Sequence, residues 1–338
     1  MLWNTSKFQL GLLFTLALAG LTTAEKKPIS EDTLDRLKRY SLLCGISYLD
    51  DCPNPPSGIT IAHRFDNNAT GIIFKDANNK EIVVTFRGTM NFRDIATDAN
   101  FLVQSDFESP GVSGCEGCKV HAGFLESWNT VAKDVISNLQ GQLAENPGMK
   151  VVVTGHSLGG AQASLAAMSI IGSGVDADVV TFGQPRTGNQ AYADFVDKMA
   201  PGLMRVTHAD DIVPQVPPKD LASSGYQHHS TEIWQEKDPD AATTFQCEGQ
   251  EPKDCNLSVK PKAKVPILGL PDINLIGNIS LSELASGSVA HSNYMGVPMG
   301  TFANGRACGK GGNIFGQVAE GLASIFLKGS SESVDKDN

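Results

Sequence analysis

A serine between two glycines is the strongest chemical signal in this sequence. The segment "GHSLG" at 155–159 follows the run "VVVT" and precedes the small-residue run "GAQASLAAMSIIG". In such a strand–turn–helix segment the turn is so tight that neighbouring side chains would collide, so glycines flank the serine two residues away on each side. The serine hydroxyl then stands at the amino end of a helix, where free N–H groups and the dipole favour a developing negative charge. The pattern predicts that Ser157 is a nucleophile; the alternative is a purely structural turn.

A serine nucleophile needs a base, and the base needs a carboxylate that orients it. In the architecture typical of this motif the chain order is serine, acid, histidine. The segment "RVTHADDIVP" supplies Asp210 and Asp211 at the end of an expected strand. Three histidines follow and leave the choice of base open: His228, His229 and His291. Four earlier histidines are expected to be structural or surface residues: His63, His121, His156 and His208.

The elements that must position these residues alternate between strand and helix from about residue 80 to 215. The run "MKVVVTG" is a solidly apolar strand of the buried parallel type, and "LGGAQASLAAMSIIG" reads as a helix ended by glycine. This alternation predicts an α/β protein with a mostly parallel sheet and helices on its faces. Before it we expect a helix over 30–49, capped by a serine, and two strands joined by an Asp-Ala-Asn-Asn turn.

Length and composition are those of a globular protein with a large core, with 338 residues, 41% hydrophobic and 19% charged. Residues 1–24 have an apolar centre followed by small residues, which predicts a secretory signal peptide and an extracellular protein; the alternative is a buried N-terminal helix. The formal net charge of −10 and the lack of a basic, aromatic-studded stripe argue against nucleic acid as a partner.

Seven cysteines in a secreted chain favour disulfides over metal thiolates. Cys115 and Cys118 in "CEGC" predict a local bridge, because no second pair has the spacing of a zinc site. Cys247 and Cys255 form a second local pair. The other three are expected to give one bridge between the start and the end of the fold and one free thiol: Cys44, Cys52 and Cys308.

Three sequons outside the signal peptide are candidates for glycosylation: Asn68, Asn256 and Asn278. We expect no metal and no organic cofactor.

The motifs quoted so far belong to a longer collinear series. The pieces "IVVTFRGT", "CEGCKVHAGF", "VTGHSLGG", "TFGQPRTGNQAYADF", "RVTHADDIVPQVPP" and "GYQHHSTEIW" resemble the fungal class 3 lipases and their relatives, the feruloyl esterases. The resemblance covers about 80–235 and 285–308. It implies an α/β-hydrolase fold, in which a central, mostly parallel sheet is flanked by helices and a lid segment covers the site.

The resemblance also implies a role for individual residues. Ser157 would be the nucleophile, Asp211 the orienting acid and His291, in "VAHSNYMG", the base. The oxyanion hole would combine the N–H of Leu158, directly after the nucleophile, with that of Thr89 at the end of "FRGT". Asp210 and the pair His228–His229 fall at positions that the family uses structurally. The implied disulfides are Cys52–Cys308, Cys115–Cys118 and Cys247–Cys255, with Cys44 as the odd thiol.

The segment 90–101, "MNFRDIATDANF", follows the oxyanion residue and is the predicted lid. Phe92, Ile95 and Ala96 fall on one helical face, with polar residues opposite. The segment has no tryptophan anchor, so it lies between an interfacial lipase lid and the more polar flap of a feruloyl esterase. The alternative is a plain surface helix.

A long apolar insert, 260–285, precedes His291 and predicts an acyl-chain wall or a second lid; the alternative is a self-packed excursion. Its candidate substrate contacts are Ile267, Leu268, Leu270 and Ile276. The expected catalytic domain is 25–310. Residues 311–338 are predicted to form a helix, which either packs on the domain or attaches to lipid, and a polar tail.

Together these features predict a secreted serine carboxylic-ester hydrolase, a lipase that acts on acylglycerols. We expect a monomer that meets its lipid or ester substrate at an oil–water or membrane interface. The alternative is a feruloyl esterase or another hydrolase of soluble esters. A non-catalytic lipid- or wall-binding protein is disfavoured, because all three triad positions and the oxyanion threonine are present.

Overall fold

The fold is known from a computed structural model, which describes residues 26–89, 103–219, 225–259, 289–300, 303 and 305–309. The predicted signal peptide, the lid segment 90–101, the insert 260–285 and the C-terminal segment 311–338 lie outside the described residues. The assignments made for Phe92, Ile95, Ala96 and Asn278, and for Ile267, Leu268, Leu270 and Ile276, therefore stay predictions.

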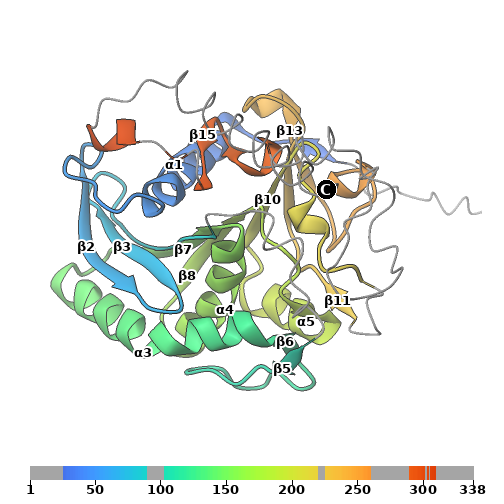
Figure 1. The fold of residues 1–338 in the computed structure, drawn as a ribbon, viewed down its shortest axis with the longest axis horizontal. Coiled ribbons are helices and arrows are strands. Elements are labelled where there is room, and N and C mark those ends of the chain that lie inside the picture. Colours follow the sequence, from blue (N-terminus) through green and yellow to red (C-terminus); the bar gives the residue numbers. More distant parts are fainter. Residues whose placement is uncertain are drawn as a thin grey trace, which may run out of the picture.

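Nine of the described strands form one central sheet, with the order β1-β13-β12-β10-β8-β7-β4-β3-β2 (Figure 1). The strands, in chain order, are β1 (Lys27–Pro28), β2 (Ile59–Asp66), β3 (Thr70–Asp76), β4 (Glu81–Phe86), β7 (Lys150–His156), β8 (Ala177–Phe182), β10 (Met204–His208), β12 (Glu232–Gln235) and β13 (Thr244–Cys247). The five strands from β4 to β12 pair in parallel. The strands at both edges pair antiparallel. The predicted parallel sheet is thus confirmed for the centre of a mixed sheet.

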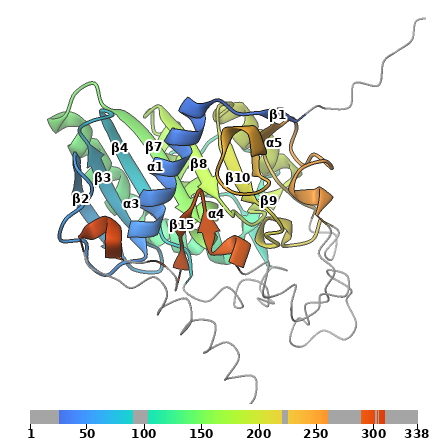
Figure 2. The same ribbon diagram turned by 90° about the horizontal axis from the view of Figure 1, so that it is seen from above.

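Helices cover both faces of this sheet. Helix α1 (Glu31–Ser47) crosses one face, while α3 (Ala122–Glu145), α4 (Leu158–Gly172) and α5 (Gln190–Met199) lie on the other (Figures 1 and 2). Because successive side chains of a strand point to opposite faces, Val151 and Val153 pack with the three-helix side and Val152 with the α1 side. The helix predicted over 30–49 is α1, and the side chain of its N-cap Ser30 accepts from the N–H of Thr33.

Smaller elements complete the described part of the chain. Strands β5 (Gln104–Asp106), β6 (Lys119–His121), β9 (Gly188–Asn189) and β11 (Tyr226–Gln227) form a second sheet, and β14 (Asn293–Tyr294) pairs with β15 (Val297–Pro298). Four 3-10 turns are present in these residues, η2 (Val213–Gln215), η4 (Ala241–Thr243), η5 (Asn256–Ser258) and η7 (Gly305–Cys308). No helix in the described ranges is long and apolar enough to cross a membrane.

Three disulfides link the cysteines in the pairs that the family resemblance implies. Cys52–Cys308 joins the loop after α1 to η7, with a Cα–Cα distance of 4.8 Å. Cys115–Cys118 and Cys247–Cys255 close short loops. Cys44 is a free, buried thiol on α1, and burial raises its pKa to about 12.

Candidate active site

Ser157 lies in a sharp turn between β7 and α4. Its φ of 62° is unusual for a residue with a side chain. The flanking glycines are required by close backbone contact, since a Cβ on Gly155 would lie 2.1 Å from the carbonyl oxygen of Gly159. A Cβ on Gly159 would lie 2.3 Å from the carbonyl oxygen of Phe86. The turn therefore exists because both positions lack a side chain, and it sets Ser157 at the amino end of α4.

Three segments that are distant in the sequence meet at this serine. Nε2 of His291 lies 2.8 Å from Oγ of Ser157, and Nδ1 of His291 lies 2.8 Å from Oδ2 of Asp211. All three side chains are buried, with exposed fractions of 1% for Ser157, 3% for His291 and 0% for Asp211. In this arrangement Nδ1 of His291 can donate to the Asp211 carboxylate while Nε2 accepts the serine proton. This is the geometry of a nucleophile, a base and an orienting acid.

The other predicted acids and bases do not reach the serine. Asp210 is only partly buried and precedes the acid that contacts His291. His228 donates from Nε2 to the carbonyl of Pro214, at 2.6 Å, and His229 accepts from the amide of Gln184, at 2.9 Å. Burial, with the charge of Arg205 next, lowers the pKa of His229 to about 3. Among the alternatives that the residues alone left open, the structure brings Asp211 and His291 together beside Ser157.

The two residues expected to form an oxyanion hole flank the same turn. Leu158 is the first residue of α4, so its N–H has no carbonyl partner within the helix. Gly88, which precedes Thr89, packs directly against the turn, because a Cβ there would lie 2.9 Å from Cβ of Ser157. Both backbone segments thus lie next to the nucleophile.

Comparison with known proteins shows which family this arrangement is similar to. The model of the lipase (class 3) family matches residues 83–221, a range that contains both Ser157 and Asp211. Secreted mono- and diacylglycerol lipase 1 of Fusarium solani is 42% identical over 176 residues, which is 50% of this chain and 49% of that protein. Over this range the chain is similar to the class 3 lipases.

Two further comparisons extend this result. A lipase of Rhizopus oryzae is 38% identical over 201 residues, 58% of this chain and 48% of the relative. Lipase II of Rhizopus niveus has a TM-score of 0.65 at 28% identity, covering 84% of this chain and 100% of that structure. Lip2 lipase of Yarrowia lipolytica has a TM-score of 0.67 at 26% identity, covering 82% and 98%. The chain spans about half the length of the two relatives compared by sequence, whereas it covers nearly the whole of these structures, which share the α/β-hydrolase fold.

Sequence reasoning missed two residues that support the acid in this α/β-hydrolase fold. The hydroxyl of Tyr294 donates to Oδ2 of Asp211, the oxygen that also faces His291. The side-chain amide of Asn256 donates to the backbone carbonyl of Asp211 at 3.0 Å. Tyr294 lies in the same short segment as His291, which is the only signal that could have indicated it. Nothing local distinguishes Asn256 from a surface residue.

The position of Asn256 argues against the glycan predicted there. Its exposed fraction is 2%, and its Nδ2, the atom that would carry the sugar, is occupied by the carbonyl of Asp211. The neighbouring Cys255 is fixed by its bridge to β13, and Gln215 donates to the Asn256 carbonyl at 3.2 Å. Asn68, in contrast, is exposed in the turn between β2 and β3 and remains a candidate acceptor.

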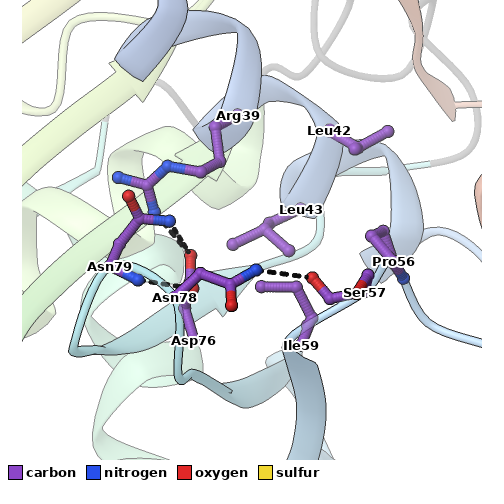
Figure 3. A pocket seen from close by; sticks show the side chains of 9 residues that line it. All are labelled: Arg39, Leu42, Leu43, Pro56, Ser57, Ile59, Asp76, Asn78 and Asn79. Atoms are coloured by element: carbon purple, nitrogen blue, oxygen red, sulfur yellow. Dashed lines mark hydrogen bonds and ion pairs between the residues drawn. The ribbon is translucent and has the colours of Figure 1, made fainter.

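A cavity of about 120 Å³ lies between α1 and the turn from β3 to β4 (Figure 3). This cavity lies at the start of β4, whereas Ser157 follows the end of the neighbouring parallel strand β7. The cavity is therefore remote from the nucleophile turn. Arg39 satisfies the acidic groups there, at 2.9 Å from Asp76 and 2.6 Å from Glu81. Within the described ranges no cluster of histidine, cysteine or acidic residues is arranged to hold a metal ion. The triad is therefore the candidate site.

Proposed function

We propose that this protein is a secreted serine carboxylic-ester hydrolase that acts on acylglycerols. The observation that carries the proposal is the position of His291, 2.8 Å from the hydroxyl of Ser157 and 2.8 Å from the carboxylate of Asp211. Secretion is supported by the predicted signal peptide, by three disulfides and by the secreted relative from Fusarium solani.

In the proposed reaction, Oγ of Ser157 attacks the ester carbonyl carbon while its proton passes to Nε2 of His291. Asp211 stabilises the imidazolium that forms. The N–H groups of Leu158 and Thr89 bind the negative oxygen of the tetrahedral intermediate, an interaction whose removal typically costs roughly a hundredfold or more in rate. The bond to the alcohol then breaks, and Nε2–H protonates the leaving oxygen.

Water completes the cycle by the same route. The oxygen of water attacks the acyl carbon while His291 takes a proton from that water. The second tetrahedral intermediate then collapses and releases the fatty acid. The proton returns from His291 to Oγ of Ser157, which restores the starting state. Every proton transfer uses a group of this chain or of the substrate, so the proposed route needs no cofactor.

The substrate class rests on the relatives and on the sequence around the site. The relatives from Fusarium solani and Penicillium camembertii are named mono- and diacylglycerol lipases. The apolar composition of the insert 260–285 suits an acyl chain rather than a polar cell-wall ester, whereas the predicted lid 90–101 lies between the two classes. We infer that 25–310 acts as one catalytic domain, as a monomer, at an oil–water or membrane surface.

Hydrolysis of a long-chain diacylglycerol or triacylglycerol emulsion, compared with methyl ferulate, tests this proposal. We expect fatty-acid release from the emulsion that rises above the solubility limit of the substrate and is lost in Ser157→Ala. Turnover of methyl ferulate with an inert emulsion would instead assign a cell-wall esterase. Activity that survives Ser157→Ala would contradict the proposed mechanism itself.

A further inference from the structure

Two buried side chains that the reaction does not use, Tyr48 and His156, connect the three parts of the proposed site. Tyr48 caps the C-terminal end of α1, and His156 directly precedes the nucleophile. The Tyr48 hydroxyl lies 3.1 Å from the backbone nitrogen of Gly88 and 2.7 Å from Nδ1 of His156. Nε2 of His156 lies 2.8 Å from the backbone carbonyl of His291. One continuous chain of hydrogen bonds therefore runs from the oxyanion segment to the base.

The groups at the two ends of this series of hydrogen bonds fix which atom donates and which accepts in each bond. The carbonyl of His291 can only accept, so Nε2 of His156 carries the proton. Nδ1 of His156 then has a lone pair and accepts from the Tyr48 hydroxyl. The phenol oxygen in turn accepts from the N–H of Gly88, which can only donate. The arrangement needs a neutral imidazole in one tautomer, and each donor and acceptor in it is satisfied.

The surroundings keep His156 neutral. Burial lowers its pKa well below the usual value, and the neighbouring His291 adds to the effect. The two imidazole ring centres are only 4.6 Å apart. Burial also raises the pKa of Tyr48, which keeps its proton. A charged His156 would compete with the imidazolium that His291 becomes during the proposed reaction, and this environment prevents that competition.

Close contacts at Gly88 link Tyr48 and the nucleophile turn to the segment that carries the expected oxyanion donor, Thr89. A Cβ on Gly88 would lie 2.3 Å from the Tyr48 hydroxyl and 2.6 Å from the carbonyl oxygen of His156. The backbone one residue before Thr89 is therefore pressed between α1 and the nucleophile turn. A shift of the Tyr48 hydroxyl would be transmitted to the peptide that carries the Thr89 N–H.

We propose that Tyr48 and His156 are positioning residues, which hold the oxyanion donor at Thr89 and the base His291 in register with Ser157. The inference rests on the proposed function, because it concerns the geometry of the same reaction. Neither residue touches the reacting atoms. Their effect comes from alignment, to which ester hydrolysis is sensitive, since misplacement of a group by about 1 Å can cost on the order of a hundredfold in rate.

The test compares Tyr48→Phe with Tyr192→Phe. Tyr192 is an equally buried tyrosine, whose hydroxyl bonds Ser164 at 2.7 Å on the helices α4 and α5, away from the chain just described. Tyr48→Phe loses two buried hydrogen bonds of its hydroxyl and Tyr192→Phe loses one, so the thermal midpoint is needed to separate lost stability from lost alignment. Turnover of a soluble p-nitrophenyl ester, thermal midpoint and affinity for an alkyl boronic acid, which mimics the tetrahedral intermediate, are measured for each.

We expect kcat of Tyr48→Phe to fall by roughly ten- to a hundredfold, with KM nearly unchanged and with boronic-acid affinity reduced by a similar factor. Tyr192→Phe is expected to keep kcat within about twofold of the wild-type value. His156→Leu, which removes both the donor and the acceptor, is expected to show the same loss in kcat and boronic-acid affinity.

Equal kcat in Tyr48→Phe and Tyr192→Phe would overturn the inference, as would a loss that appears only in KM. A wild-type protein that hydrolyses no ester would instead overturn the proposed function, so the two failures are distinguishable.

Discussion

The hydroxyl of Tyr294 donates to Oδ2 of Asp211, the same carboxylate oxygen that accepts from Nδ1 of His291. Oδ1 accepts from the N–H of Val213 at 2.9 Å. The buried carboxylate is therefore held by three donors and has one orientation toward the base. Burial and the charge of Asp211 raise the pKa of Tyr294 well above its usual value, so this donor keeps its proton through alkaline pH.

We therefore predict that Tyr294→Phe lowers both activity and stability. Removing one bond to a charged group costs roughly 1.5–3 kcal/mol, and the loosened carboxylate aligns His291 less well. We expect kcat on a soluble ester to fall by about tenfold and the free energy of unfolding in urea to fall in the range just given. A variant with wild-type kcat would show that Tyr294 does not orient Asp211.

The buried histidines predict a loss of stability in acid. Burial lowers the pKa values of His156, His228 and His229, that of His229 to about 3. The unfolded chain binds protons at these residues once the pH falls below about 6.5, whereas the folded chain does not, so the free energy of unfolding declines as the pH falls. For His229 this decline spans the interval from about 6.5 to about 3.

Urea denaturation at pH 8, 7, 6 and 5 measures this effect. Each such histidine contributes on the order of 1 kcal/mol per pH unit below pH 6.5. We expect His229→Gln to be less stable at pH 8, because the bond from Gln184 changes, but to show a shallower decline toward pH 5. A wild-type stability that stays level from pH 7 to pH 5 would contradict the assignment of neutral, buried histidines.

The nucleophile turn could be predicted from the sequence because its causes are local. The apolar strand, the glycine spacing and the small-residue helix occupy neighbouring positions, and the structure shows the close contacts at Gly155 and Gly159 that the spacing implies. The choice between Asp210 and Asp211, or among three histidines, depends on the strand order β7-β8-β10 and on where 289–292 returns. Those contacts are distant in sequence, so only the family resemblance indicated them.

Other features could not be predicted from local sequence patterns, for related reasons. Strands β1, β12 and β13 have two to four residues each, too few for a readable alternation. The sequon at Asn256 is a local pattern as well, but the burial of Asn256 depends on its packing against the loop that carries Asp211, called the acid loop below. Sequence motifs thus identified the chemistry, while the side chains that support Asp211 required the folded chain.

Asn256 gives a direct test of that packing. We predict that glycopeptide mass spectrometry of protein secreted by a fungal host finds Asn256 unmodified and Asn68 glycosylated. Asn256→Ala leaves the Asp211 carbonyl without its donor, which costs roughly 1–3 kcal/mol of stability, whereas Asn68→Ala changes stability little because that side chain is exposed. A glycan on Asn256 in active protein would contradict the described position of the acid loop.

The most direct test of the central claim is covalent labelling of the native protein with a long-chain p-nitrophenyl phosphonate, followed by peptide mapping. The account predicts one phosphonyl group on Ser157, and ester hydrolysis lost in proportion to the label. Asp211→Asn should slow labelling by a large factor, because the base His291 then lacks its orienting charge. Labelling at another residue, or full hydrolysis by protein modified at Ser157, would contradict the assignment of Ser157 as the nucleophile.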